Sequence, residues 1–421
     1  MVVTAPYTVT PEEGLNNALD SVGSLAEVTY NDASDIEAAA ALAARSDVAI
    51  VMVGDISREG VDRSDLALPH TDGVDQDALV SAVAAANANT VVVLKNGGPV
   101  LLPWLDEVPA VLEAWYPAQE DGNIVGNLLV GLENPSGKLP ITFPTQEREG
   151  ATATVEQWPG IDPDGSGPLP LTATYSEGLE MGYRWYDAND VAPTFAFGYG
   201  LSYTSFALSN VTVTPGSNDG TAPVEVSFSV KNTGEVRGAE VGQVYLGLPD
   251  EANQPPKRLV GFDKVTLNPG ESKRVSVTID PAASNHPLSV WDEDADGWKI
   301  VEGEYSVLIG NASNNITLED SFTISGPPFD IATEASTRTL AGKAYVTATV
   351  INNGEIPLDV VLSTPYGDKK FTAVQPGKKA SVSINSTSAS IPSGTVTATV
   401  SGTVDGELVT YTSTADYAAA G

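Results

Sequence analysis

The chain of 421 residues contains no cysteine and only two histidines, His70 and His286. Without cysteine, disulfide bonds and thiolate metal sites are excluded, and the redox compartment of the protein cannot be inferred. So few histidines argue against a histidine-based metal site or a Ser-His-Asp triad. We therefore expect neither a metal nor a cofactor.

Long apolar runs are missing as well. No stretch is long enough to span a bilayer, and the first ten residues, MVVTAPYTVT, lack the basic and apolar regions of a signal peptide. The apolar fraction of 42% and the mean hydropathy of -0.04 are typical of a globular protein.

Positive charge is scarce. The chain has 21 basic and 55 acidic residues, a net charge of -34 and a sequence pI near 4.1. Such a surface repels nucleic acid and anionic membranes, so neither is expected as a partner. The charge suits a neutral substrate and is typical of an acidic secreted or salt-adapted protein.

Helix and strand patterns alternate in the first third of the chain. Thr10 and Glu13 are spaced as a capping box, and Ser34 and Glu37 as a second one. The expected helices are 10–19, 34–45, 75–87 and 120–132, and the expected strands are 24–30, 47–53, 90–94 and 110–116. Apolar strands separated by helices predict a mainly parallel α/β sandwich, which we assign to residues 1–144.

The rest of the chain differs in composition and in its pattern of expected elements. Residues 145–205 read as a connector that ends in an aromatic, Gly-rich stretch expected to fill a seam between domains. Alternating strands and Asn-Thr-Gly or Asn-Pro-Gly turns predict a β-sandwich at 206–326. A second all-β sandwich is expected at 331–421, where VINNG and KKASVSI echo VKNTG and KRVSVTI of the first.

The segment GDISREGVDR directly follows an apolar strand, and half of its ten residues are charged: Asp55, Arg58, Glu59, Asp62 and Arg63. A loop at the carboxyl end of a parallel strand is where α/β folds place ligands. The residues alone leave two interpretations open, a solvated loop or a carboxyl held in a controlled environment.

Residues 47–69, 89–144 and 182–206 together resemble glycoside hydrolase family 3, the β-glucosidase and β-xylosidase family. The blocks are DVAIVMVGDISREGVDRSDLALP, a segment from NTVVVLKNGGPV to GKLPITFP, and GYRWYDANDVAPTFAFGYGLSYTSF, in collinear order. The resemblance extends over roughly residues 1 to 325. It implies a six-stranded α/β sandwich followed by a fibronectin-type-III-like domain.

The resemblance also implies an active site shared between two domains. In the family, a barrel domain supplies a nucleophilic Asp, and a loop of the α/β sandwich supplies the general acid/base Glu, which matches Glu59 here. A retaining mechanism needs two carboxyls about 5–5.5 Å apart, one of them protonated at rest. We expect Arg58, Asp62 and Arg63 to bind substrate or support the site, with a possible Asp62–Arg63 pair fixing the loop.

Other candidates have simpler interpretations. Asp55, like Asp62, is expected to be structural or exposed, and Glu120 is expected to be a first-turn acid favoured by the helix dipole. Trp104, Trp115 and Tyr116 are interpreted as core aromatics rather than sugar platforms. Gly97 and Gly98 mark a tight turn without a nucleotide-binding pattern around it.

No segment of the 421 residues matches the nucleophile motif of the family's barrel. The sequence therefore predicts the C-terminal half of a retaining β-glucosidase-like hydrolase, inactive without a barrel domain or barrel chain. An oligosaccharide or aryl β-glycoside is the expected substrate, and a secreted or extracellular location is suspected. The alternative hypothesis is a non-catalytic carbohydrate-binding or structural module.

Overall fold

The computed structural model describes residues 5–57, 60–162, 171–404 and 406–421. The chain divides into two compact units. Unit 1 comprises Met1–Gly216 and Ala222–Phe322, and unit 2 comprises Ser217–Thr221 and Thr323–Gly421. Each unit is treated by itself below.

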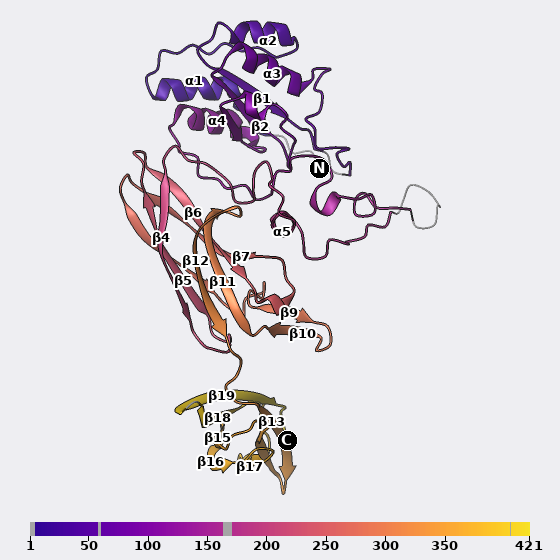
Figure 1. Ribbon diagram of the computed structural model, residues 1–421, viewed down its shortest axis with the longest axis vertical. Helices are drawn as coiled ribbons and strands as arrows, with labels where there is room; N and C mark the ends of the chain where they lie inside the picture. Colours follow the sequence, from indigo (N-terminus) through magenta and orange to yellow (C-terminus); the bar gives the residue numbers. More distant parts are fainter. Residues whose placement is uncertain (1–4, 58–59, 163–170, 405) are drawn as a thin grey trace. The chain divides into compact units, whose positions relative to one another are not determined.

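Unit 1 begins with alternating helices and strands (Figure 1). The helices are α1 (Pro11–Ser21), α2 (Ile36–Ala43), α3 (Gln76–Ala86) and α4 (Asp121–Val130). The strands are β1 (Ala49–Gly54), β2 (Thr90–Lys95) and β3 (Ala110–Glu113), in the order β1-β2-β3 with both pairings parallel. Short 3₁₀ turns are η1 (Leu105–Glu107), η2 (Ala118–Glu120) and η3 (Gly150–Thr152). The prediction of a parallel α/β layer is confirmed.

Local capping decides where two of these helices begin. The predicted box at the start of α1 is present: the Thr10 amide donates to the Glu13 carboxylate at 2.9 Å, and the Glu13 amide donates to Thr10 Oγ1 at 3.3 Å. The box predicted from Ser34 is wrong. Asp35 caps α2 instead, accepting from the Glu37 amide at 2.9 Å, because its carboxylate already reaches the free N–H groups of the first turn.

The strand expected at residues 24–30 is also wrong. This segment has no strand partner, and it leaves Leu25 97% and Tyr30 67% exposed. The apolar and polar residues of the segment alternate as they do in a strand, but no apolar surface packs against its apolar side chains. Among the described residues the parallel sheet has three strands, compared with the six that the family resemblance implies.

Glycines allow α1 and α4 to pack closely. A Cβ atom on Gly14 would overlap the backbone of Gly122, and one on Gly126 would lie 2.6 Å from the Gly14 carbonyl oxygen. The Asn17 side chain also donates to Asn123 Oδ1 at 3.1 Å across this contact. Side chains at these glycines would force the helices apart.

The second part of unit 1 is a β-sandwich. One sheet has the order β4-β5-β8 and the other β12-β11-β6-β7. The bounds are β4 (Phe206–Pro215), β5 (Val224–Asn232), β6 (Gly238–Gly247), β7 (Arg258–Leu267), β8 (Ser272–Ile279), β11 (Gly303–Ala312) and β12 (Asn315–Ile324), with η4 at Asp250–Ala252. A separate hairpin is formed by β9 (Ser289–Asp292) and β10 (Gly297–Ile300), which lies to one side of the larger sheets in Figure 1.

The aromatic, Gly-rich segment packs on this sandwich from helix α5 (Tyr183–Ala188) onwards. Tyr183 stacks on Phe197 with ring centroids 4.9 Å apart, and its hydroxyl accepts from the Leu259 amide at 2.7 Å. The Gln243 side chain donates to the Gly198 carbonyl at 3.0 Å. The Tyr183 ring also meets Tyr245 of β6 edge-on, with centroids 5.8 Å apart, so ring contacts and hydrogen bonds join the segment to β6 and β7.

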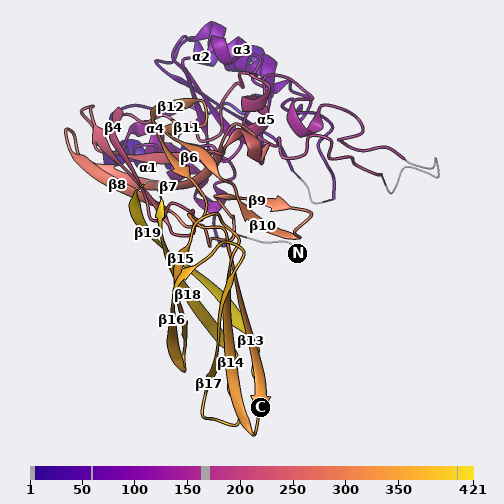
Figure 2. The ribbon, with the colours of Figure 1, turned by 60° about the horizontal axis from the view of Figure 1, so that its bottom comes forward.

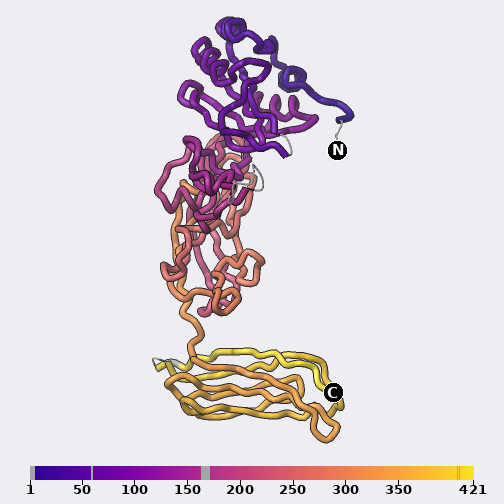
Figure 3. Tube along the Cα trace, turned by 90° about the vertical axis from the view of Figure 1, so that its right-hand side faces the viewer, coloured from indigo at the N-terminus to yellow at the C-terminus, as the bar shows by residue number. Residues whose placement is uncertain are grey.

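Unit 2 is a second antiparallel β-sandwich. Its sheets have the orders β13-β14-β17 and β16-β15-β18-β19, and Figure 2 shows β13, β14 and β17 apart from β15, β16 and β18. The bounds are β13 (Ile331–Leu340), β14 (Lys343–Asn352), β15 (Leu358–Thr364), β16 (Gly367–Val374), β17 (Lys379–Asn385), β18 (Gly394–Val404) and β19 (Glu407–Tyr417). In Figure 3 the orange and yellow tube of this unit runs back and forth in extended, neighbouring segments. The predicted fold class, α/β followed by two β-sandwiches, is confirmed.

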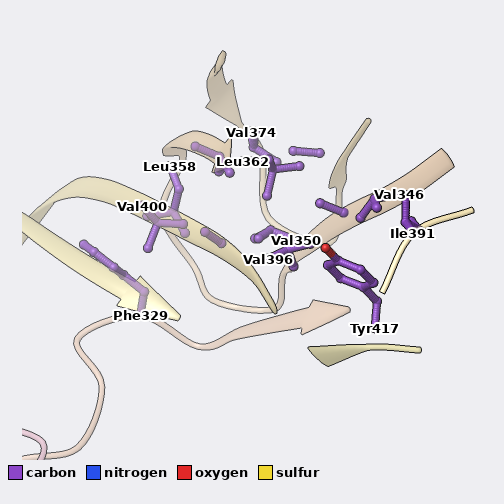
Figure 4. Packing of buried hydrophobic residues seen from close by; sticks show 14 of the residues in the cluster. Phe329, Val346, Val350, Leu358, Leu362, Val374, Ile391, Val396, Val400 and Tyr417 are labelled. Atoms are coloured by element: carbon purple, nitrogen blue, oxygen red, sulfur yellow. The ribbon is translucent and has the colours of Figure 1, made fainter. Parts of the chain in front are cut away.

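The core of unit 2 lies between its two sheets. Val346 and Val350 from β14 meet Val396 and Val400 from β18, all fully buried, and the Tyr417 ring covers the same cluster (Figure 4). Alternating β-branched residues on each strand place one face inward.

Both sandwiches use the same buried asparagine. Asn232 is fully buried, and its amide group donates to the carbonyls of Val236 at 2.8 Å and Leu267 at 3.1 Å. Asn352 holds the equivalent place in unit 2 and donates to the carbonyls of Ile356 and Val374, both at 2.8 Å. The sequence echo between VKNTG and VINNG thus reflects a shared turn structure.

We predict that Asn352→Ala lowers the free energy of unfolding of unit 2 by about 2–4 kcal/mol, because it removes the donors to the partly buried Ile356 carbonyl and the buried Val374 carbonyl. Chemical unfolding of the full chain measures this change. Asn353→Ala is the matched control, since Asn353 is exposed and its substitution should change stability by no more than about 0.5 kcal/mol. Equal effects of the two substitutions would contradict the assigned role of Asn352.

Candidate functional site

The candidate site lies at the carboxyl edge of the parallel sheet. Because β1, β2 and β3 run in the same direction in adjacent register, Asp55, Asn96 and Glu113 emerge at the same edge. The candidate loop begins here, at Gly54. Ligands of open α/β sheets bind at this edge.

Asp55 is the central side chain of this edge. It is only 7% exposed, and its carboxylate accepts hydrogen bonds from the Gly97 amide at 3.0 Å, from Arg63 Nη1 at 3.1 Å and from the Tyr116 hydroxyl. These donors come from the loops after β1, β2 and β3. The interpretation of Asp55 as structural agrees with this geometry.

Arg63 joins the far end of the candidate loop to the sheet edge. One guanidinium nitrogen pairs with Asp55, and the other donates to the Pro99 carbonyl at 2.8 Å. The pairing of Arg63 with Asp62 is therefore corrected: the acidic partner of Arg63 is Asp55, and Asp62 is exposed. A buried carboxylate offers a less hydrated and more fixed partner than a neighbouring surface acid.

Two of the predicted site residues, Arg58 and Glu59, lie outside the residues that the structure describes. The nearest described part of the loop is close to the turn after β2. The Tyr116 hydroxyl contacts Ser57 Oγ at 3.3 Å, and a Cβ atom on Gly97 would lie 3.0 Å from the Tyr116 ring. The loop thus leaves the sheet beside a turn in which a side chain at Gly97 would crowd the Tyr116 ring.

Glu113 was missed as a candidate. Burial raises the pKa of Glu113 to about 7, and the nearby Asp55 carboxylate acts in the same direction. Glu113 Oε1 accepts from the Trp115 amide at 2.8 Å, whereas its Oε2 and the neighbouring Asn96 Oδ1 are buried acceptors without a donor among the described residues. A proton on Oε2 would supply a donor between them. The sequence feature that could have identified Glu113 as a candidate is its position at the end of an apolar strand.

An ion pair at this sheet edge was also not predicted from the sequence. Lys95, at the end of β2, pairs with Asp121 at the start of α4, and both side chains are about one-fifth exposed. The pair fixes the helix end to the same sheet edge.

Glu120, the rival carboxyl, is placed differently. Its carboxylate accepts from the Tyr7 hydroxyl and from the Asn123 side chain at 2.8 Å. The Tyr7 hydrogen bond is the main reason that the pKa of Glu120 is lowered. A carboxyl that is held ionised is poorly suited to donate a proton, and its position just before α4 fits the role of a helix-start acid.

The aromatic residues near this edge are largely structural. Trp104 is 1% exposed and donates to Asp77 Oδ1 at 2.7 Å, and Trp115 packs against Phe143 with ring centroids 6.2 Å apart. Tyr116 is half exposed while its hydroxyl is bound to Asp55, so the interpretation of it as a core aromatic is only partly right.

Within the described ranges, no group of three or more His, Asp or Glu side chains is arranged to hold a metal ion. The helices of those ranges are all too short or too polar to cross a membrane.

Comparison with family models matches two parts of the chain. Residues 1–203 match the glycosyl hydrolase family 3 C-terminal domain, and residues 240–313 match a fibronectin type III-like domain.

Curated relatives are β-glucosidases. Thermostable beta-glucosidase B of Acetivibrio thermocellus is 36% identical over 331 residues, which cover 74% of this chain and 42% of that protein. Beta-glucosidase B of Emericella nidulans is 43% identical over 284 residues, or 66% of this chain and 32% of that protein. The chain thus spans less than half the length of these relatives.

The solved structures that resemble this chain include β-glucosidases as well. DesR, a beta-glucosidase from Streptomyces venezuelae in complex with D-glucose, has a TM-score of 0.63 and 40% identity over 69% of this chain and 35% of its own. A beta-D-glucoside glucohydrolase from Trichoderma reesei has a TM-score of 0.66 and 31% identity over 77% of this chain and 46% of its own.

The raised pKa of Glu113 makes stability depend on pH. In the unfolded chain this carboxyl ionises near its ordinary value of 4.5, whereas in the folded state it stays protonated to about 7. Between pH 4.5 and about 7, the folded state therefore binds one proton more than the unfolded chain. Its free energy of unfolding falls as the pH rises through this range.

We predict that Glu113→Gln removes this loss. Between pH 5 and pH 8, the free energy of unfolding of the unsubstituted protein should fall by up to about 3 kcal/mol relative to that of the variant. Chemical unfolding at a series of pH values measures the difference. Glu107→Gln, at an exposed carboxyl ahead of the same strand, should give a pH profile parallel to that of the unsubstituted protein. A parallel profile for Glu113→Gln would contradict the assignment.

Proposed function

We propose that the chain is the C-terminal half of a retaining β-glucosidase-like hydrolase, because residues 1–203 match the glycosyl hydrolase family 3 C-terminal domain. Such an enzyme removes terminal β-linked sugars. The observation that carries the proposal is the joint presence of this domain and a charged loop anchored at the carboxyl edge of its sheet. The β-glucosidase names of the relatives support the reaction class.

In this proposal Glu59 is the general acid/base. It would protonate the glycosidic oxygen as the bond to the leaving group breaks, and later accept a proton from the attacking water. Its place in the chain supports the role, because it lies between Asp55 and Arg63, whose ion pair links the two ends of its loop. The acidic residues of this edge would also disfavour the charged form of a nearby carboxyl and so keep it protonated at rest.

The neighbouring residues have supporting roles. Arg63 holds the loop through Asp55 and the Pro99 carbonyl, so we assign it to site support rather than to sugar binding. Arg58 and Asp62 remain proposed contacts to substrate or to the loop. None of these roles needs a cofactor.

The nucleophile is assigned to a barrel, either a domain of the same protein or a separate chain. A retaining mechanism would bring its carboxyl to about 5–5.5 Å from Glu59. The 421 residues alone are therefore proposed to be inactive. Oligosaccharides and aryl β-glycosides are the proposed substrates, and a secreted or extracellular location is proposed from the acidic composition.

We predict that Glu59→Gln lowers kcat/KM for an aryl β-glucoside with a poor leaving group by about 10²–10⁴-fold in the enzyme that includes the barrel. A 2,4-dinitrophenyl β-glucoside, whose leaving group needs no proton, should lose far less in the step that cleaves its bond. Steady-state and burst kinetics on the two substrates measure this contrast.

Glu27→Gln is the control, since Glu27 is an exposed carboxyl in the segment between α1 and α2. It should leave both rates unchanged. If Glu59→Gln kept full activity on the poor leaving group, the acid/base assignment would be wrong. An equal loss on both substrates would point to a folding or binding defect instead.

A further inference from the structure

Unit 1 carries a cavity that the proposed hydrolysis does not use, lined by residues of the fibronectin type III-like match and by Leu179 and Arg184, which precede it in the chain. It has a volume of about 300 Å³, and its lining includes residues of α5 and of the β9–β10 hairpin. Its walls combine indole rings with polar and cationic side chains, including Trp291, Trp298, Arg184, Arg258, Gln254 and Asn285. The volume is at the lower limit of small-molecule sites, which suits a short ligand.

Two tryptophans form the aromatic wall. Trp291 on β9 and Trp298 on β10 lie opposite each other in the hairpin, with ring centroids 5.6 Å apart and planes at 81°. They are 50% and 51% exposed. His286 stacks on Trp298 at 4.1 Å, which fixes one face of that indole and leaves the rest available. Two half-exposed indoles held in fixed orientations are typical of a binding surface.

The cationic wall contains an unsatisfied guanidinium. Arg258 Nη1 donates to the Ser289 carbonyl at 3.2 Å, but its Nη2 is buried and has no hydrogen-bond partner in the described part of the chain. Burial, followed by the positive charge of Arg184, lowers the pKa of Arg258. Both arginines line the same cavity, where their like charges repel each other.

Neither arginine has an acidic partner among the residues that the structure describes, whereas Lys257 in the same wall is paired with Asp187 at 2.6 Å. Two guanidinium groups without a counter-charge are unexpected in a chain with a net charge of -34. A buried donor without a partner costs free energy, which an anionic ligand would relieve.

We propose that this cavity binds a uronic acid residue of an acidic saccharide. The carboxylate would accept hydrogen bonds from Arg258 and Arg184, because guanidinium groups match the planar geometry of a carboxylate. The apolar face of the sugar ring would lie on the exposed indole surface, and Gln254 and Asn285 would contact its hydroxyls. A neutral saccharide would leave both guanidinium groups unpaired, so we infer selectivity for the acid.

The site is independent of Glu59 and of any catalytic turnover, so its test needs only binding. Isothermal titration of the full chain with tri-galacturonate should give at least about tenfold tighter binding than with cellotriose, a neutral sugar of matched length. Raising the salt concentration should weaken the binding of tri-galacturonate.

Three variants locate the interaction. Arg184→Met should weaken binding of tri-galacturonate by about tenfold or more, the effect expected for a hydrogen bond to a charged group. Trp291→Ala should weaken binding of the same sugar. Lys299→Met removes the same charge from the hairpin at an exposed side chain outside the cavity walls, and should leave affinity unchanged. Thermal melting shows that each variant is folded.

Three results would overturn the proposal. One is equal or absent binding of tri-galacturonate and cellotriose by the folded chain. Another is undiminished binding in both Arg184→Met and Trp291→Ala. The third is equally tight binding of inorganic phosphate or benzoate, which would show that the cavity does not select a saccharide.

Discussion

The buried Asp55 carboxylate is the interaction on which the proposed site depends. It takes hydrogen bonds from the Gly97 amide, the Tyr116 hydroxyl and Arg63, and so joins the segments that follow all three parallel strands. A charged group with 7% exposure is stable only when such donors surround it. The same contacts fix both ends of the loop that contains Glu59, although they do not themselves act on a substrate. We therefore propose that Arg63 is a positioning residue.

The sheet edge contains several acidic side chains that differ in burial and in their hydrogen-bond donors. Asp55 accepts hydrogen bonds from three donors. The hydrogen bonds of Glu120 with Tyr7 and Asn123 lower the pKa of Glu120, whereas burial raises the pKa of Glu113 to about 7. Because their environments differ, Glu120 and Glu113 would lose their protons in different pH ranges. That separation is what acid/base chemistry requires of a set of neighbouring carboxyls.

Local patterns in the sequence were sufficient for the fold class, the capping box of Thr10 and Glu13, and the strand from which the candidate loop leaves. They failed where the answer depends on distant partners. Residues 24–30 alternate like a strand, yet nothing covers them, and the partner of Arg63 is eight residues away rather than adjacent. The raised pKa of Glu113 and the unpaired Nη2 of Arg258 could not be predicted, because each results from burial by segments remote in the sequence.

The central claim is that the chain provides one half of a shared active site. The most direct measurement is hydrolysis of 4-nitrophenyl β-glucoside by three samples: the purified 421-residue chain, a family 3 barrel produced separately, and the two mixed. Only the mixture should release 4-nitrophenol, because the proposed acid/base and the nucleophile come from different parts. Release by the 421-residue chain alone, at the rate of the mixture, would contradict the central claim, since the nucleophile would then lie within these residues.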